Sequence, residues 1–109
     1  MSKVGGPQTA DRPGIWGVGP EGSVELLLED DGGDWSLEEV VELFGLGRTE
    51  EDPQENLHLV LALREARQLK PLADANSFDH EEGLIQAMLA MARFAQGHPG
   101  PELRFIQSF

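Results

Sequence analysis

The stretch DHEEGLIQAMLAMARFAQ, residues 79–96, decides how this chain folds. On a helical wheel this stretch has a single compact polar edge, formed by Glu82, Gln86 and Arg93. Apolar or small residues cover the rest of the circumference, which is typical of a helix inside a core. Asp79 and Glu82 form a capping pair at its start, and Gly97 predicts its end. We therefore expect a buried helix over about residues 80–96, with the other elements packed around it.

A second helix is predicted upstream, over about residues 36–44. Ser36 and Glu39 have the spacing of a capping box, in which each side chain binds the backbone N–H of the other residue. Apolar residues then recur on one face, and Gly45 follows the last of them as a stop signal. A helix this short is unstable in isolation, so its apolar face must dock on the rest of the domain.

The segment between residues 52 and 71 carries two conflicting signals. Asp52 and Pro53 followed by Glu55 are typical of a helix start, and the segment ends in helix-forming and cationic residues. Within it, however, four leucines alternate from residue 57 to residue 63, as they would in a strand. The start signal and the length predict a helix over about residues 53–69. The choice between helix and strand for residues 57–63 stays open.

Strand signals stand at both ends of the chain. Residues 14–18 and 23–29 are β-prone runs separated by a Gly-Pro-Glu-Gly turn, which predicts a hairpin. Residues 102–109 alternate and predict a last strand. The expected fold is α+β, with an N-terminal β-hairpin, three helices and a C-terminal strand, the helices packed on one face of a small antiparallel sheet. We expect residues 1–13 to be a flexible N-terminal segment and residues 14–109 to form a single α+β domain.

The charge of the chain is concentrated in one third of its length. The formal net charge is −12, from 20 acidic and 8 basic residues. Residues 21–55 contain thirteen of the acids with Arg48 as the only base, so this third accounts for the whole imbalance. If these acids form one surface, it repels nucleic-acid phosphates and anionic membranes and attracts a cationic partner. A solvated face that keeps a small protein soluble is the simpler interpretation of the same charge.

The segregation of charge favours a binding surface, because solubility alone does not require it. Glu38 and Glu42 would form an unfavourable like-charge pair on one helix face. We therefore predict a partner-binding surface formed by Glu25, Glu29, Asp30, Asp31, Asp34, Glu38, Glu39, Glu42, Glu50, Glu51 and Asp52.

Other kinds of site find little support. Residues 79–82 bring Asp, His and Glu together, but their spacing matches neither a zinc motif nor a calcium loop. The serines lie outside any Gly-x-Ser-x-Gly elbow, and the chain has no Cys. The pattern Gly17-x-Gly19-x-x-Gly22 spans the predicted hairpin turn, where a dinucleotide site would need a strand-to-helix turn. We therefore expect no catalytic residue, no metal site and no cofactor.

The leading hypothesis is a small acidic protein, not an enzyme, that binds a basic surface on a protein partner and inhibits or regulates it. Immunity proteins and inhibitors that mimic nucleic acid use this physics, and the partner is then a nucleic-acid-binding protein. Trp16, Trp35 and Phe109 are apolar anchors if they are exposed. The alternative is an assembly or chaperone-type subunit that uses the Met- and Ala-rich helix 80–96 as an oligomer or peptide interface.

The expected setting is the cytoplasm, without direct contact to nucleic acid or membrane. No apolar run approaches the ~20 residues that span a bilayer, and no hydrophobic leader is visible. Monomer and dimer both remain open.

Overall fold

The computed structural model describes residues 12–108 except Pro20, Asp31 and Pro99. The predicted flexible segment, residues 1–13, therefore lies almost entirely outside the described residues. The elements in chain order are β1 (Gly14–Val18), β2 (Val24–Glu29), α1 (Glu38–Phe44), β3 (Arg48–Glu51), β4 (Leu57–Ala62), α2 (Leu63–Ala66), α3 (Leu69–Ala75), α4 (Glu82–Gly97) and β5 (Glu102–Ser108).

The strands form one antiparallel sheet in the order β2-β1-β5-β4-β3. The C-terminal strand β5 is therefore central, with the N-terminal hairpin on one side and the β3–β4 hairpin on the other. The predicted α+β class, the N-terminal hairpin and the C-terminal strand are all confirmed, and the last strand pairs with β1 of that hairpin.

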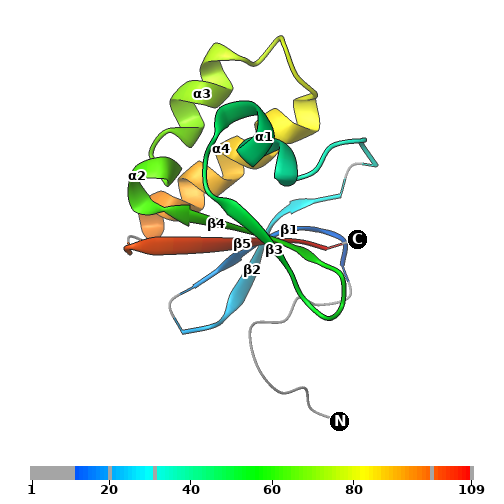
Figure 1. Ribbon diagram of the computed structural model, residues 1–109, viewed down its shortest axis with the longest axis vertical. Coiled ribbons are helices and arrows are strands. Elements are labelled where there is room, and N and C mark those ends of the chain that lie inside the picture. The colour runs from blue at the N-terminus through cyan, green and yellow to red at the C-terminus, as the bar shows by residue number, and fades with distance from the viewer. Residues whose placement is uncertain (1–11, 20, 31, 99, 109) are drawn as a thin grey trace.

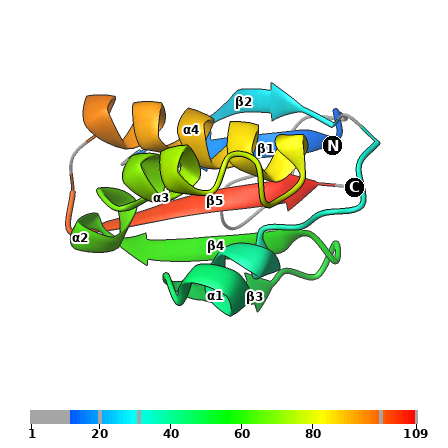
Figure 2. The same cartoon turned by 90° about the horizontal axis from the view of Figure 1, so that it is seen from above.

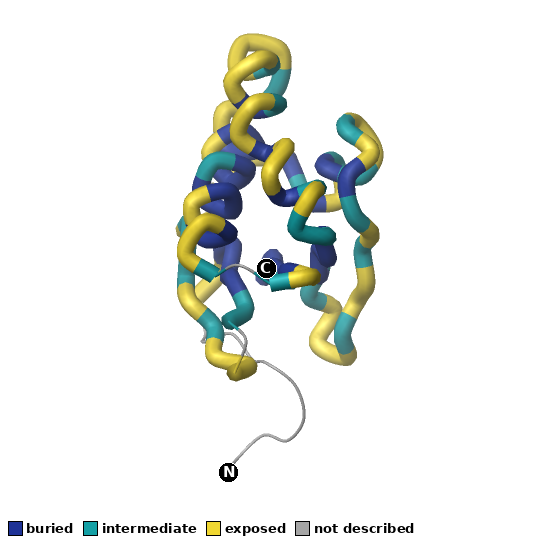
Figure 3. The backbone as a smooth tube through the Cα atoms, turned by 90° about the vertical axis from the view of Figure 1, so that its left-hand side faces the viewer, coloured by how far each residue is buried: buried dark blue, intermediate teal, exposed yellow. Residues whose placement is uncertain are grey.

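The helices lie on one side of the sheet, as the two ribbon views show (Figures 1 and 2). One hydrophobic core fills the space between the layers and includes Ile15, Leu59, Leu61 and Phe105 from the strands. The connections at the ends of the molecule are mostly exposed (Figure 3). We call the other side of the sheet the helix-free face; register places Trp16, His58, Val60, Arg104 and Ile106 there.

The predicted helix over residues 53–69 is wrong in its first ten residues, which form a turn and strand β4. Asp52 does cap a turn, but it is a hairpin turn: its Oδ1 accepts backbone N–H groups of Gln54 and Asn56, both at 2.9 Å. Glu55 takes a left-handed conformation with φ 66°, which ends any helical path. The alternating leucines then face the core from a strand hydrogen-bonded on both sides, so the strand alternative holds.

The second half of that segment is helical but broken. α2 covers Leu63–Ala66, and α3 begins at Leu69 and continues past the expected stop at Pro71. Pro71 occupies the first turn of α3, where its missing N–H would have no partner within the helix anyway. Glu65 stabilises the corner before α2, because its carboxylate accepts N–H groups of Ala62 at 2.8 Å and Gly47 at 3.0 Å.

The two other predicted helices form near their expected positions. α1 ends at Gly45, whose φ of 68° is the left-handed conformation expected of a stop signal. Only half of its predicted capping box forms, with Ser36 N–H donating to Glu39 Oε2 at 3.2 Å and no side-chain cap by Ser36. α4 begins at Glu82 without a side-chain cap, so the predicted Asp79 cap does not form. α4 is buried over ten of its sixteen residues, as its all-round apolar composition predicts.

The contact between α4 and the sheet depends on close approach at β1. The ring of Phe94 lies edge to face with that of Phe105, with centroids 5.7 Å apart. A Cβ at Gly17 would lie only 2.8 Å from Cε1 of Phe94. Gly17 therefore has a packing role, since any larger residue there would displace the aromatic ring that joins the two layers.

We predict that Gly17→Ala lowers the free energy of unfolding by about 1–3 kcal/mol, the usual cost of overpacking. Gly97→Ala is the matched control. Gly97 is the last helical residue of α4 and is not among the glycines with positive φ. Its added methyl meets no atom within 4 Å, and alanine has a higher helix propensity than glycine. Urea unfolding of both variants checks this. A Gly17→Ala protein as stable as the unchanged protein would contradict the proposed packing role.

Candidate functional site

The acidic residues predicted to bind a partner fall into three groups in the structure. Asp31 lies outside the described residues. The groups are β2 and its end (Glu25, Glu29, Asp30), the β2–α1 connection with α1 (Asp34, Glu38, Glu39, Glu42), and β3 with its turn (Glu50, Glu51, Asp52). β2 and β3 are opposite edges of the sheet, so the two strand groups are separated. The connection and α1 run between them around one end of the sheet (Figure 2).

The β2 group is partly engaged within the molecule. Glu29 forms an ion pair with Arg12, and both side chains are more than half exposed. Asp30 Oδ1 accepts the N–H of Gly32 at 3.2 Å. Glu25 is exposed and, together with Arg93, borders an open hollow of about 270 Å³ beside the last turns of α4.

The β3 group is held more firmly, because Glu50 lies between two arginines. Arg104 Nη1 is 3.0 Å from Glu50 Oε1, and Arg48 Nε is 3.3 Å from Glu50 Oε2. The hydrogen bond and charge of Arg104 hold the pKa of Glu50 below its ordinary value, with a smaller effect of Arg48. Arg48 also reaches Glu102 Oε2 at 3.3 Å, so much of the negative charge here is balanced locally.

A buried histidine extends this network on the helix-free face. His58 Nε2 lies 2.8 Å from Asp52 Oδ2, and His58 Nδ1 lies 2.9 Å from Arg104 Nη1. A guanidinium has donors and no acceptor, so Nδ1 accepts and Nε2–H donates to Asp52. Burial raises the pKa of Asp52, but hydrogen bonds from His58 and from the backbone of Asn56 and Gln54 outweigh it and lower that pKa below its ordinary value.

This Asp–His pair has the residue types of an acid–base site but lacks its geometry. A general base needs a ring nitrogen within reach of a substrate proton. Both nitrogens of His58 are already bonded to protein groups, and its side chain is only 8% exposed. The network therefore joins β3, β4 and β5 and stabilises the β3–β4 hairpin. Sequence reasoning missed it because it placed residues 53–69 in a helix and because Arg104 lies 46 positions away.

The middle acidic group forms the exposed part of the predicted surface. Glu38 and Glu42 are exposed one turn apart on α1. Leu43 beside them is 48% exposed. Gln107 fixes the connection that precedes α1, because its side chain accepts the Leu37 N–H at 2.8 Å and donates to the Trp35 carbonyl at 3.4 Å. The entry to α1 is thus tied to the central strand β5, while α1 itself packs beside the edge strand β3.

The loop between α3 and α4 adjoins α1 and adds residues that the sequence did not single out. The rings of Phe44 and His80 meet edge to face with centroids 5.5 Å apart. Figure 1 shows this loop beside α1 at one end of the molecule. Phe78 in this loop is 100% exposed. Asp79, Glu81 and Glu82 of this segment are exposed as well. Full exposure of a phenylalanine could not be inferred from its position in the chain.

We name this region the α1 surface: Asp34, Glu38, Glu39, Glu42, Leu43, Phe78, Asp79, Glu81 and Glu82. Among the residues that the structure describes, no salt bridge joins its acids to a base. The α1 surface therefore combines uncompensated negative charge with two exposed large apolar side chains.

Two of the three aromatic residues considered as anchors from the sequence are buried. Trp16 and Trp35 are buried, and Phe109 lies outside the described residues. The apolar side chains of α4 are also buried: Met88 and Met91 have no exposed area, and Phe94 is 6% exposed. In this fold α4 therefore presents mainly its polar edge to the outside.

The described part of the chain shows neither a cluster of metal-binding residues nor a membrane-spanning helix. Within residues 12–108, the three gaps aside, no group of three or more His, Cys, Asp or Glu residues is arranged to hold a metal ion. No helix in the described part is long and apolar enough to cross a bilayer.

Comparison of the chain with protein-family models, curated proteins and solved structures gives no match.

We predict that three carboxylates with lowered pKa values make the fold sensitive to acid. Asp52, Glu50 and Glu65 have native pKa values below their ordinary ones, so the native state favours their charged forms. Their contribution is complete above the unfolded values of about 4, and it is lost as pH falls through the lower native values. The free energy of unfolding should therefore fall steadily below about pH 4.

Asp52→Asn tests the network behind that acid sensitivity. It sets an amide donor against His58 Nε2–H, which should cost about 1–3 kcal/mol near neutral pH. It should also reduce the loss of stability between about pH 4 and pH 2. Glu51→Gln removes the same charge on the neighbouring exposed residue, outside the network. Equal behaviour of the two variants in urea unfolding across pH would show that the network does not stabilise the fold.

Proposed function

We propose that this chain is an acidic binding protein, not an enzyme, whose α1 surface engages a basic surface on a protein partner and thereby inhibits or regulates that partner. The proposal places the protein in the cytoplasm, with no direct binding of nucleic acid. A nucleic-acid-binding protein is the partner class that offers a suitable cationic face. Of the eleven acids named from the sequence, Asp34, Glu38, Glu39 and Glu42 belong to this surface.

The observation that carries the proposal is that Glu42 is exposed where its charge opposes the stability of α1, whereas Glu38 and Glu39 in the first turn are favoured by the helix dipole. Glu38 and Glu42 are like charges at i and i+4, which is unfavourable. Glu42 also lies in the last turn, where the helix dipole favours a cation, and that turn has no basic residue. Exposed residues that lower the stability of their own helix are typical of functional surfaces.

The exposed apolar residues supply binding free energy that the acidic residues alone do not. Acidic residues steer a basic partner and raise the association rate, but rim charges contribute little to residence time. Large apolar side chains that become buried on binding supply most of the binding free energy. Phe78 and Leu43 are the two large hydrophobic residues exposed in the described chain. The α1 surface thus combines exposed acids with two apolar side chains that a partner can bury.

The binding test uses a partner captured from native cells and then purified, with its dissociation constant measured against salt concentration. We expect the dissociation constant to rise with salt, and Phe78→Ser to weaken binding about tenfold without loss of stability. Glu42→Lys should weaken binding while raising the free energy of unfolding by about 0.3–0.5 kcal/mol, because it converts the repulsion with Glu38 into an attraction.

The matched controls for these variants are Glu21→Lys and Glu55→Lys, exposed acids in the two hairpin turns away from α1. They change the net charge equally. Weakening by the control variants to the same extent as by Glu42→Lys would mean that only net charge matters. A dissociation constant independent of salt would overturn the charge-driven mechanism itself.

A further inference from the structure

A hollow of about 380 Å³ lies between the α2–α3 corner and the last turns of α4. Its floor is made by the small side chains of Ala66, Ala92 and Ala95, which are 2%, 8% and 8% exposed. Alanines at 92 and 95, one turn apart on α4, leave the space that larger side chains would fill. The volume is at the lower end of the range for small-molecule sites, so it suits a small ligand.

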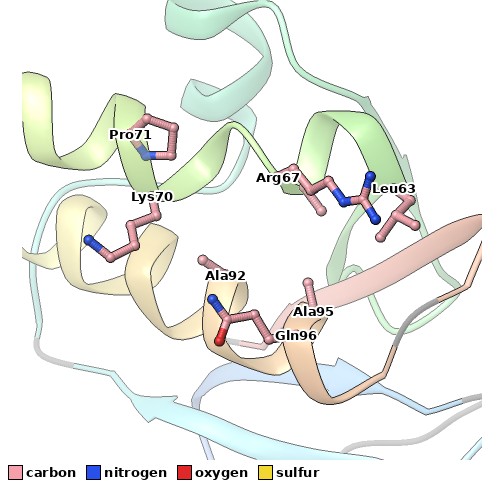
Figure 4. Close-up of a pocket in the computed structure, with 8 residues that line it drawn as sticks. Leu63, Arg67, Lys70, Pro71, Ala92, Ala95 and Gln96 are labelled. Atoms are coloured by element: carbon pink, nitrogen blue, oxygen red, sulfur yellow. The ribbon is translucent and has the colours of Figure 1, made fainter.

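Cationic side chains flank this apolar floor. Figure 4 shows Lys70 on one side of Ala92 and Ala95, Arg67 on the other, and the Gln96 amide near them. Lys70 Nζ is 2.7 Å from Asp74 Oδ2, an exposed pair that contributes little and can exchange. Arg67 is exposed and makes no salt bridge with any residue that the structure describes. Arg67 is thus the cation most available to an anion entering the hollow.

This local environment contrasts with the charge of the rest of the chain. The protein carries a net charge of −12, and its acidic third lies in residues 21–55, whereas residues 63–74 contribute three bases and two acids. Glu65 is engaged by the N–H groups of Ala62 and Gly47, and Asp74 is paired with Lys70. An anion at the hollow therefore meets Arg67, whose positive charge is unpaired among the described residues.

We propose that this hollow binds a small amphipathic carboxylate, with the carboxylate on Arg67 and the apolar part on the alanine floor. The planar guanidinium donates two parallel hydrogen bonds to a carboxylate, which an ammonium group does not match. The alanine floor adds the removal of apolar ligand surface from water. This site is separate from the α1 surface, and its existence does not depend on the proposed partner.

The test is a titration of the ¹⁵N-labelled full chain with octanoate, kept below its aggregation concentration and followed by amide chemical shifts. We expect saturable shifts centred on Ala66, Arg67, Ala92 and Ala95. Acetate, which has the charge but no tail, and octanol, which has the tail but no charge, should each bind at least tenfold more weakly. Arg67→Gln should weaken octanoate binding about five- to tenfold, as expected for loss of one charged hydrogen-bond partner.

Arg93→Gln is the matched control, because Arg93 is an exposed arginine that lies outside this hollow. It should leave octanoate binding unchanged. Equal binding of octanol and octanoate, equal weakening by the two arginine variants, or shifts centred elsewhere in the chain would each overturn the proposal. Ala95→Leu should fill the hollow and abolish the shifts. If the Ala95→Leu protein does not fold, the octanoate affinity of Arg67→Gln tests the proposal in its place.

Discussion

The central position of β5 is the constraint on which the rest of the structure depends. This strand is the last part of the chain, yet it pairs with the N-terminal hairpin through β1 and with the β3–β4 hairpin through β4. Its side chains contact three other parts of the molecule. Phe105 packs against Phe94 of α4, and Gln107 binds the backbone of the connection before α1. Arg104 binds Glu50 and His58. The two halves of the sheet are one unit only because β5 joins them.

This arrangement divides the acidic third of the chain into two kinds of carboxylate. Glu50 and Asp52 on the β3 hairpin are tied into the sheet by Arg104 and His58, so their charge contributes to structure. Glu38 and Glu42 project from α1, which Gln107 anchors at its entry and the Phe44–His80 contact supports at its exit. The same residue type thus serves stability on the edge strand β3 and remains available for a partner on the helix α1, which packs beside that strand.

The predictable parts of the fold are those encoded over a short stretch of sequence. The apolar circumference of α4, the glycine stop of α1 and the N-terminal hairpin are local signals, and all three hold. The sequence does not decide between helix and strand for β4, because the Asp52 and Pro53 that begin its hairpin turn are also typical of a helix start. Only pairing with β3 and β5 selects the strand. The His58–Arg104 contact and the exposure of Phe78 depend on residues brought together by the whole fold. The sequence likewise does not distinguish the acids of β2, α1 and β3, because only the folded structure shows which of them form ion pairs.

The central claim is that uncompensated carboxylates are gathered on the α1 surface and repel one another. The most direct measurement is the melting temperature of the full chain as sodium chloride rises from about 10 mM to 150 mM, which shortens the screening length from about 30 Å to about 8 Å. Our account predicts that the melting temperature rises over this range, and that it rises less once Glu38 and Glu42 are both replaced by glutamine. A melting temperature that stays flat or falls with salt would show that these charges are already paired or dispersed, and would contradict the account.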